Sequence, residues 1–498
     1  MNDITKWANE SSSDSPRVFW LTGQAGSGKT TIAYTIARRF EKGGSADQHA
    51  ILGGNFLCSR QFEETQGRTQ IIPTIAYQLA RKCKPYADVL HVADKFDAVN
   101  RDVVTQLKDL LIGPWQHSEP MRRPKLPPYL IIIDALDEIK DDGGSAFLHD
   151  LLAAIDEYDL RGLKFLVTSR PNLEVVKLLK SFASEANCRL QEVPIEEAKP
   201  DVELYVKERL KELDGRPELD ELVKRAGGLF VYAATAVRYL AGSVTVEEQI
   251  DMLKDLFSKS HKPPSGSDAF LLIDNLYRQI MLDAFSDLDE MALASRLCIL
   301  YTCLCTAERT SASTVALLVH RHLVLGGEDK AVRAVLRDLH AVLYTRGDRI
   351  YWHHSSFADF IFTQARSNFR IRENNFAFSC NEPSHHKFLS ESCFRIMKSS
   401  LRFNMGNIPS SFLFDRDNTI ALSKQINQNI GAGARYASRY WTHHLATAEL
   451  TNTDYVCDSI SEFLQIRILF WIEAMNLLGI SDQCTAMLQY ARQWVIKV

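Results

Sequence analysis

The chain has 498 residues, of which 46% are hydrophobic and 24% are charged. These values are typical of a folded globular protein, and the length predicts about three or four domains. The formal net charge is only −4, which excludes a strong overall field that would recruit nucleic acid or an anionic membrane surface.

Short apolar strands alternate with amphipathic segments over residues 1–195, the pattern of a mostly parallel sheet covered by helices. The segment 117–128 is rich in Pro and Arg and predicts a surface loop. We therefore expect an α/β fold in this part of the chain. The predicted strands are 18–21, 51–57, 129–133 and 164–168.

A phosphate-binding motif, G-x-x-x-x-G-K-T, follows the first predicted strand and opens a segment with apolar residues at helical spacing. Its glycines let consecutive backbone N–H groups point at phosphate oxygens, at the positive end of a helix. We expect Lys29 to reach the terminal phosphates and Thr30 to ligate Mg²⁺. The predicted nucleotide-binding residues here are Gly23, Gln24, Ala25, Gly26, Ser27, Gly28, Lys29, Thr30 and Thr31.

An entirely apolar strand ends in Asp134, which places a carboxylate at the edge of the sheet where such folds bind ligands. We expect Asp134 to hold Mg²⁺ through a coordinated water. Many related ATPases carry a glutamate at the next position to orient the attacking water, but this chain has Ala135. Asp137 and Glu138 follow shortly after and are predicted to polarise that water. The alternative interpretation of these acids is a solvated acidic turn.

A second buried strand ends in Thr168-Ser169-Arg170, and Pro171 stops it. An arginine at the carboxyl end of a strand beside the phosphate loop can contact the γ-phosphate. We therefore predict that Arg170 senses the terminal phosphate and joins Asp134, Asp137 and Glu138 as a catalytic residue. The alternative is an ordinary surface arginine at the end of a strand.

Helical patterns dominate after residue 196, beginning with a predicted helix over 201–213. A stretch rich in Pro, Gly and Ser at 261–267 predicts a linker. Beyond it, helices precede a predicted strand pair, 341–344 and 349–352, joined by a Gly-Asp turn. Helices followed by such a hairpin suit a winged-helix module.

Cysteine and histidine spacings indicate no metal site besides the predicted Mg²⁺ site. Three His-His pairs occur, at 353–354, 385–386 and 443–444. Adjacent residues on a helix or strand are expected to point apart, so each pair would supply at most one ligand to a given zinc ion. The ten cysteines form no C-x-x-C pair, and we see neither a membrane span nor a secretion signal, so we expect a cytoplasmic protein.

These motifs resemble those of the NACHT family of signal-transducing NTPases, within the STAND class. The chain is most similar to the fungal NLR-like group named after the N-terminal domain of nephrocystin-3. The phosphate loop resembles the family's first motif, 131–138 resembles its acidic motif, and Ser169-Arg170 resembles its sensor arginine. The segment 227–233 lies where relatives carry a Gly-Leu-Pro turn near the nucleotide base, with Phe230 replacing the proline.

The residues His354-Ser355-Ser356-Phe357-Ala358-Asp359-Phe360 resemble the family's winged-helix motif H-x-S-F-x-D-F. The resemblance implies that His354 contacts the β-phosphate of a bound diphosphate. It extends over essentially the whole chain and implies four domains. These are a nucleotide-binding NACHT domain over 1–195, a helical domain over 196–265, a winged-helix domain over 266–370 and a C-terminal helical domain over 371–498.

The family resemblance implies a switch that cycles between a closed form with ADP or GDP and an open, oligomerising form with ATP or GTP and Mg²⁺. Hydrolysis would be slow, and the pathway would be innate immunity or self/non-self signalling. Relatives carry an effector domain before the phosphate loop and sensing repeats after the helical region. We see neither here, so protein partners that act through them are expected but not encoded.

Two other classes of function stay open at the level of sequence. One is a P-loop kinase acting on a small acceptor, although we see neither an acceptor pocket nor an arginine-rich lid. The other is an interaction scaffold that binds nucleotide for stability without turnover. The sequence favours the switch, with nucleotide-dependent self-association and no nucleic-acid partner, and leaves ATP and GTP as alternatives.

Overall fold

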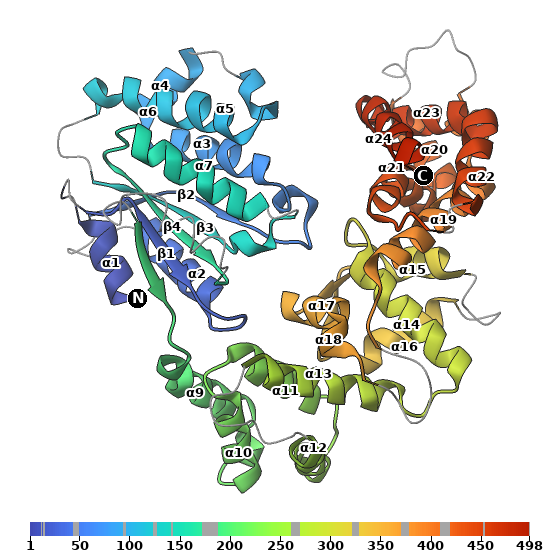
Figure 1. Cartoon of the computed structure of the whole chain (residues 1–498), viewed down its shortest axis with the longest axis horizontal. Helices are drawn as coiled ribbons and strands as arrows, with labels where there is room; N and C mark the ends of the chain where they lie inside the picture. Colours follow the sequence, from blue (N-terminus) through green and yellow to red (C-terminus); the bar gives the residue numbers. More distant parts are fainter. Residues whose placement is uncertain are drawn as a thin grey trace. The chain divides into compact units, whose positions relative to one another are not determined.

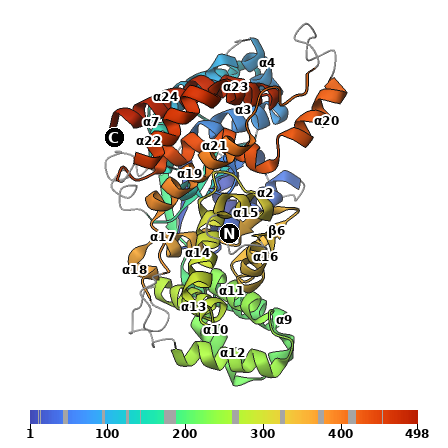
Figure 2. The same cartoon turned by 90° about the vertical axis from the view of Figure 1, so that its right-hand side faces the viewer.

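The computed structural model describes residues 1–10, 12, 15–42, 49–92, 96–122, 127–140, 143–171, 188–259, 269–320, 328–369, 378–408, 419–451 and 454–497. The chain divides into two compact units, Met1–Ile273 and Asp274–Val498 (Figures 1 and 2). The predicted linker at 261–267 lies outside the described residues. Within the described part of the chain, no helix combines the length and apolar character needed to cross a membrane.

The first unit is built on a five-stranded parallel sheet in the order β2-β3-β4-β1-β5. Phe165 of β4 lies opposite Val18 of β1 on one side and Ile131 of β3 on the other, so β4 separates the other two strands. The strands are β1 (Val18–Thr22), β2 (Ile51–Leu57), β3 (Tyr129–Asp134), β4 (Leu163–Ser169) and β5 (Cys188–Glu192).

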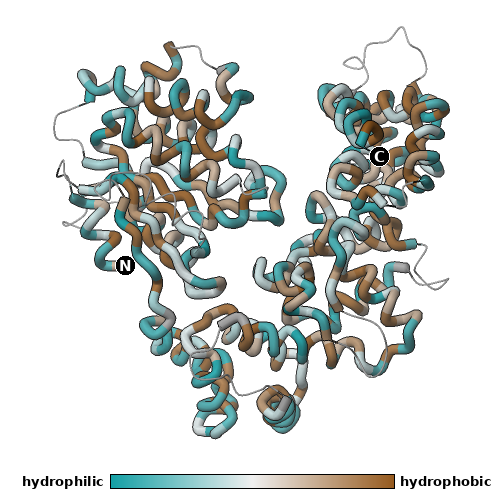
Figure 3. Tube along the Cα trace, viewed as in Figure 1, coloured by the Kyte–Doolittle hydropathy of each residue, from teal (hydrophilic) through white to brown (hydrophobic). Residues whose placement is uncertain are grey.

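Helices cover both faces of this sheet (Figure 1). Successive strand residues point to opposite faces, so Phe19 and Trp20 of β1 enter two different hydrophobic clusters. The Phe19 cluster includes Trp7 of α1 (Asn2–Asn9) and residues of α2 (Lys29–Lys42). The larger Trp20 cluster includes residues of α3 (Ile71–Lys82) and α7 (Gly143–Glu157). Figure 3 shows hydrophobic segments gathered along the strands, as a sheet buried on both faces requires.

The remaining helical elements of the first unit are short or lie beyond the sheet. In chain order they are η1 (Glu63–Thr65), η2 (Arg68–Gln70), α4 (Lys84–Val92), η3 (Phe96–Asn100), α5 (Val103–Gln106), η4 (Leu107–Ile112), α6 (Gly113–His117), η5 (Glu119–Met121), η6 (Leu136–Glu138), η7 (Ile195–Ala198), α9 (Lys199–Arg209), η8 (Lys211–Leu213), α10 (Pro217–Ala226), α11 (Phe230–Leu240) and α12 (Val246–Lys259). The helix predicted over 201–213 therefore forms as α9, followed by a separate 3₁₀ turn.

All four predicted strands form, and the expected α/β architecture with a helical remainder is confirmed. The structure also contains a fifth strand, β5, and the helix α1, neither of which is among the elements predicted above. β5 is an edge strand with polar, exposed positions such as Arg189 and Glu192, so it lacks the apolar run that marks the central strands. The predicted loop at 117–128 contains the 3₁₀ turn η5, and residues 123–126 lie outside the described residues.

The second unit is mostly helical. Its elements are α13 (Ala269–Phe285, which begins in the first unit), α14 (Glu290–Cys305), α15 (Ala312–Val319), α16 (Glu328–Asp338), β6 (Leu343–Arg346), β7 (Arg349–Trp352), α17 (Ser355–Phe362), α18 (Gln364–Ser367), α19 (Glu382–Ser400), α20 (Thr419–Asn429), α21 (Ala432–Thr447), α22 (Asp454–Glu462), η11 (Phe463–Arg467), α23 (Ile468–Leu477), η12 (Ser481–Gln483) and α24 (Cys484–Lys497). The predicted hairpin forms as antiparallel β6 and β7, turning at Gly347 with φ of +64°.

Aromatic side chains form much of the core among the C-terminal helices. Trp441 of α21 is fully buried and packs edge-on against Trp471 of α23, with ring centroids 6.1 Å apart. The Trp471 indole N–H donates to the carbonyl of Ser438 at 2.9 Å. Tyr436 and Tyr440 of α21 are also buried, so the aromatic side chains of this helix belong to the core.

Candidate functional site

The predicted site residues of the first unit converge at one edge of the sheet. The phosphate loop leaves β1, Asp134 is the last residue of β3, and Arg170 directly follows β4. Parallel strands present their carboxyl ends at the same edge, and β4 is the neighbour of both other strands. The order of the strands therefore places Arg170 between the phosphate loop and the acidic segment.

The phosphate loop has the backbone conformation that its glycines permit. Gly26 and Gly28 have φ angles of +77° and +87°, which L residues with a side chain rarely adopt. A Cβ atom on Gly26 would lie 2.2 Å from Cγ1 of Val231, so that position also has no room for a side chain. The loop leads into the N-terminus of α2, where the first backbone N–H groups are free of intrahelical partners and favour an anion.

The ammonium group of Lys29 lies inside this loop. Its Nζ donates to the carbonyl oxygens of Gly23 at 2.6 Å and Gln24 at 2.8 Å. Burial lowers the pKa of Lys29 to about 8; the charge of Asp137 opposes this shift, that of Arg170 adds to it, and Asp134 and Glu138 oppose it more weakly. The charged form of Lys29 is poorly solvated, so a bound polyphosphate would stabilise it by placing negative charge beside the ammonium.

The Ser27 hydroxyl is a polar group of the loop that fits such a ligand. The Ser27 hydroxyl and the Oε1 atom of Gln24 are buried without a hydrogen-bond partner. Buried polar atoms are nearly always satisfied in folded proteins, and the Ser27 hydroxyl can donate to a phosphate oxygen. The amide oxygen of Gln24 can only accept, so its partner must be a donor such as water. Thr30 and Thr31 lie at the start of α2 with exposed side chains, where a phosphate or a metal ion could reach them.

Asp134 is buried, with 2% of its surface exposed. The hydroxyl of Thr168 donates to Asp134 Oδ1 at 2.5 Å and accepts the backbone N–H of Ala135 at 2.9 Å. Burial raises the pKa of the Asp134 carboxyl, while the hydrogen bonds from Thr168 and Thr30 and the charge of Lys29 lower it. A carboxylate held in this way next to the Thr30 hydroxyl is a suitable pair of oxygen ligands for Mg²⁺.

Thr168 is a further residue of the site, beyond those predicted from the sequence, although its place in the strand indicates a polar role. A hydroxyl-bearing residue inside a fully buried strand needs a polar partner, and the acid at the end of the neighbouring strand offers one. Ala135 adopts a left-handed conformation with φ of 60° and ψ of 49°. This turn ends β3 and starts the 3₁₀ segment that carries Asp137 and Glu138.

Arg170 and Asp137 form an ion pair. Arg170 Nε lies 2.9 Å from Asp137 Oδ2, and the Arg170 backbone N–H donates to Asp137 Oδ1 at 3.1 Å. Both side chains are about one fifth exposed. Arg60, which the sequence analysis gave no role, donates through Nη2 to the carbonyl of Asp137 at 2.9 Å, and its backbone N–H donates to Glu138 Oε2 at 3.4 Å.

The segment after α10 packs directly against the phosphate loop. The Phe230 backbone N–H donates to the carbonyl of Gly26 at 3.0 Å, and the Phe230 ring lies 3.6 Å from the Cβ position of Gly28. A proline at this position would have no N–H to donate. Phe230 therefore contributes a hydrogen bond from α11 to the loop.

His354 lies in the second unit, as the N-cap of α17. Its Nδ1 accepts the backbone N–H of Ser356 at 3.1 Å and lies 2.8 Å from the Ser356 hydroxyl. The Tyr277 hydroxyl is 2.8 Å from that same hydroxyl. These contacts give His354 a capping role within its own unit, and its predicted contact with a nucleotide stays a prediction.

Proton uptake on triphosphate binding is expected to increase between pH 7 and pH 9.5. The pKa of Lys29 is about 8 in the free loop, and the negative charges of a bound triphosphate raise it. Binding above pH 8 therefore takes up as much as about one proton, and the affinity falls as the pH rises through the free pKa. Calorimetry in buffers of different ionisation enthalpy measures this uptake. An uptake that stays constant between pH 7 and pH 9.5 in the wild-type chain would contradict the assignment.

Residues 1–170 match the family model described as nephrocystin 3, N-terminal. No curated protein matches the chain. Similar solved structures include the Walker-type ATPase of Pyrococcus abyssi, with 13% identity and a TM-score of 0.33 over 72% of this chain and 94% of that one. They also include Drosophila ORC bound to DNA, with 13% identity and a TM-score of 0.28 over 72% of this chain and 93% of that one.

Proposed function

We propose that this chain, which carries a nephrocystin-3-like P-loop NTPase domain in residues 1–170, is a signalling switch controlled by a nucleoside triphosphate and its diphosphate product. The observation that carries the proposal is the phosphate loop. Its buried Lys29 ammonium and unpartnered Ser27 hydroxyl lie at the same sheet edge as Asp134 and Arg170. This arrangement suits a polyphosphate with its metal ion.

In this proposal each residue at the edge of the sheet has its own task. Lys29 moves from the loop carbonyls to the terminal phosphates, and the loop N–H groups hold the phosphate oxygens. Thr30 and Asp134 would hold Mg²⁺, which neutralises phosphate charge when bound. Arg170 leaves Asp137 for the γ-phosphate, and Asp137 and Glu138 then orient a water for slow hydrolysis.

The Arg170–Asp137 ion pair is the element that reports which nucleotide is bound. Without a γ-phosphate, Arg170 stays on Asp137 at 2.9 Å. With a γ-phosphate, the arginine has a more highly charged partner, and the carboxylate becomes available to water. The presence of the third phosphate is thereby converted into a rearrangement of the segments that follow β3 and β4.

The switch further requires a latch, and we propose that His354 supplies it. We also propose a helical domain over 196–265, a winged-helix domain over 266–370 and a C-terminal helical domain over 371–498. A diphosphate would bridge the loop and His354 and hold a closed state. Shifting a two-state equilibrium from 1:99 to 99:1 takes about 5.5 kcal/mol of differential binding. One charge-assisted contact supplies only about 1.5–3 kcal/mol. A protein partner or a second copy of the chain must supply the rest, as in innate-immunity or self/non-self signalling.

Replacing His354 is expected to speed the release of a bound diphosphate roughly 10- to 100-fold, because one charge-assisted contact is lost. His354→Ala also removes the cap of α17, whereas His354→Asn keeps a capping oxygen and removes only the imidazole. Both variants should release a fluorescent ADP analogue faster in stopped-flow measurements. His353→Ala, the exposed neighbour, should release it at the wild-type rate. Wild-type release from His354→Asn would show that the latch does not exist.

The nucleotide that co-purifies with the chain tests the switch against the other classes of function. We expect tightly held ADP or GDP, identified by chromatography after denaturation of the protein, and slow hydrolysis that needs no acceptor. An empty site combined with fast, acceptor-dependent turnover would instead make the chain a kinase. Bound triphosphate that never turns over would make it a scaffold.

A further inference from the structure

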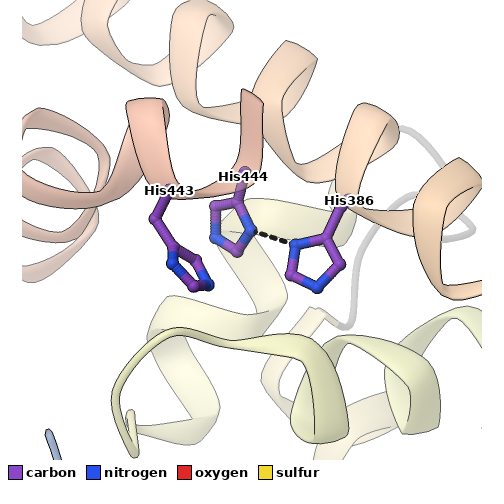
Figure 4. A group of neighbouring side chains, drawn as sticks. All are labelled: His386, His443 and His444. Carbon is purple, nitrogen blue, oxygen red and sulfur yellow. Dashed lines mark hydrogen bonds between the residues drawn. The ribbon is translucent and has the colours of Figure 1, made fainter. Parts of the chain in front are cut away.

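Three histidines gather in the second unit, whereas the predicted phosphate loop belongs to the first. His386 is on α19, and His443 and His444 are on α21. Each offers one nitrogen, and the three nitrogens lie within 4.8 Å of one another. Figure 4 shows His443 and His444 leaving α21 on the same side, toward His386 on the neighbouring helix. His386 and His444 are buried, and His443 is partly exposed.

This arrangement contradicts the expectation that one His-His pair supplies at most one ligand. Adjacent residues on a helix are separated by about 100°, not by the 180° of a strand, so both can lie on the half of the helix that faces a neighbour. A third residue on that neighbour then meets both rings. The rule does hold for the pair on α19, where His385 turns to Thr302 of α14, with its Nε2 3.0 Å from the hydroxyl.

Hydrogen bonds orient the rings of His386 and His444. His386 Nδ1 and His444 Nδ1 are 2.8 Å apart and share one proton. His444 Nε2 lies 2.8 Å from the Tyr436 hydroxyl, and His386 Nε2 lies 3.8 Å from Glu382 Oε1. The Nε2 atoms of both rings therefore face an oxygen. Metal-binding histidines are commonly oriented by such a partner on the ring nitrogen that does not bind the metal.

We propose that His386, His443 and His444 bind one zinc ion, with the fourth position open to water or to a side chain. Zinc prefers neutral imidazole nitrogens at about 2.0–2.1 Å in a tetrahedron, which sets the nitrogens about 3.3 Å apart. The Nδ1 atoms of His386 and His444 need to separate by only about 0.5 Å to reach that spacing.

Binding of zinc would not require the protein to release a proton. The proton between the two Nδ1 atoms moves to the Nε2 atom of the ring that carried it, so that both Nδ1 lone pairs face zinc and both rings stay neutral. The Nε2 atoms can then donate toward Glu382 and Tyr436. His443 is partly exposed, so a zinc ion could reach the site from solvent at this residue.

A zinc ion at this position would cross-link α19 to α21. These helices pack side by side through buried residues, among them Phe394 and Trp441, whose ring centroids are 5.3 Å apart. The ion would therefore make the packing of the C-terminal helices depend on metal. This dependence is separate from any nucleotide, because the three ligands all belong to the second unit.

The test is zinc titration of the tag-free full-length chain, stripped of metal and free of nucleotide, in competition with a chromophoric chelator. We expect one zinc ion per chain and a higher melting temperature with the ion bound. His443→Gln should weaken binding roughly 100-fold, because it removes one ligand at a partly exposed position. His385→Gln is the matched control, since it changes the neighbour of His386 without touching the cluster, and should bind zinc as the wild type does.

Two further measurements keep the outcome decisive. His386→Gln should lose binding as His443→Gln does, and circular dichroism checks that both variants keep their helices. Cobalt substitution distinguishes nitrogen from sulfur ligands, because thiolates add a charge-transfer band in the near ultraviolet. Failure to bind one zinc ion, binding unchanged by His443→Gln, or a cobalt–thiolate band would each overturn the proposal.

Discussion

Replacement of Lys29 by methionine is expected to abolish triphosphate binding while leaving the fold intact. The ammonium supplies charge-assisted hydrogen bonds to the terminal phosphates, each worth about 1.5–3 kcal/mol. Loss of two such bonds weakens binding roughly 10²- to 10⁴-fold. Methionine keeps the aliphatic stem that packs inside the loop, and Lys29→Ala should show the same loss. Calorimetric titration with triphosphate and Mg²⁺ measures the effect.

The melting temperature of the Lys29 variants shows whether a loss of binding is caused by unfolding. Burial lowers the pKa of Lys29 to about 8, below its unfolded value. Keeping this lysine charged in the folded chain therefore costs stability, fully below pH 8 and progressively less as the pH rises toward the unfolded pKa. Removal of the charge at pH 7 should therefore not lower the melting temperature of the chain. Lys82→Ala, at the exposed end of α3, is the matched control and should bind as the wild type does. Wild-type affinity in Lys29→Met would refute the assignment of the phosphate loop.

Replacement of Asp134 by asparagine is expected to remove the Mg²⁺ dependence of triphosphate binding and to reduce hydrolysis roughly 100-fold or more. Asparagine keeps the oxygen that accepts from the Thr168 hydroxyl but loses the charge that attracts the metal ion. Affinity measured with and without Mg²⁺ should be equal in Asp134→Asn and different in the wild type. Phosphate release under multiple turnover measures the hydrolysis.

Two controls show whether Asp134→Asn affects the metal ion alone: the stability of this variant and the behaviour of a surface variant. Because burial raises the pKa of this carboxyl, its ionised form costs stability above the unfolded pKa, and the neutral amide should be at least as stable at pH 7.5. Asp220→Asn on the exposed surface of α10 should change neither binding nor hydrolysis. A wild-type response to Mg²⁺ in Asp134→Asn would show that another residue holds the ion.

The sheet and the phosphate loop could be predicted because their signals are local. Buried apolar residues predominate in the central strands, as in residues 18–21 of β1 and 129–133 of β3. The glycine and lysine positions of the loop follow from the backbone shape that phosphates require. β5 could not be predicted in this way, because an edge strand with exposed polar residues such as Arg189 resembles a loop in sequence.

The features missed by sequence analysis depend on contacts between distant segments. Thr168 meets Asp134 across two strands, and the Phe230 N–H reaches the loop some 200 residues before it. The three histidines meet only because α19 and α21 pack against each other. Composition and spacing along one element carry no information on which residue of another element lies opposite, so these contacts require the structure.

The most direct test of the central claim is an experimental structure of the full-length chain with a non-hydrolysable triphosphate analogue and Mg²⁺. We expect the β- and γ-phosphates inside the loop Gly23–Thr30, with the Ser27 hydroxyl and the Lys29 ammonium bonded to phosphate oxygens. We further expect Arg170 to have left Asp137 for the γ-phosphate. A loop without phosphate, with Lys29 still on the carbonyls of Gly23 and Gln24, would contradict the account.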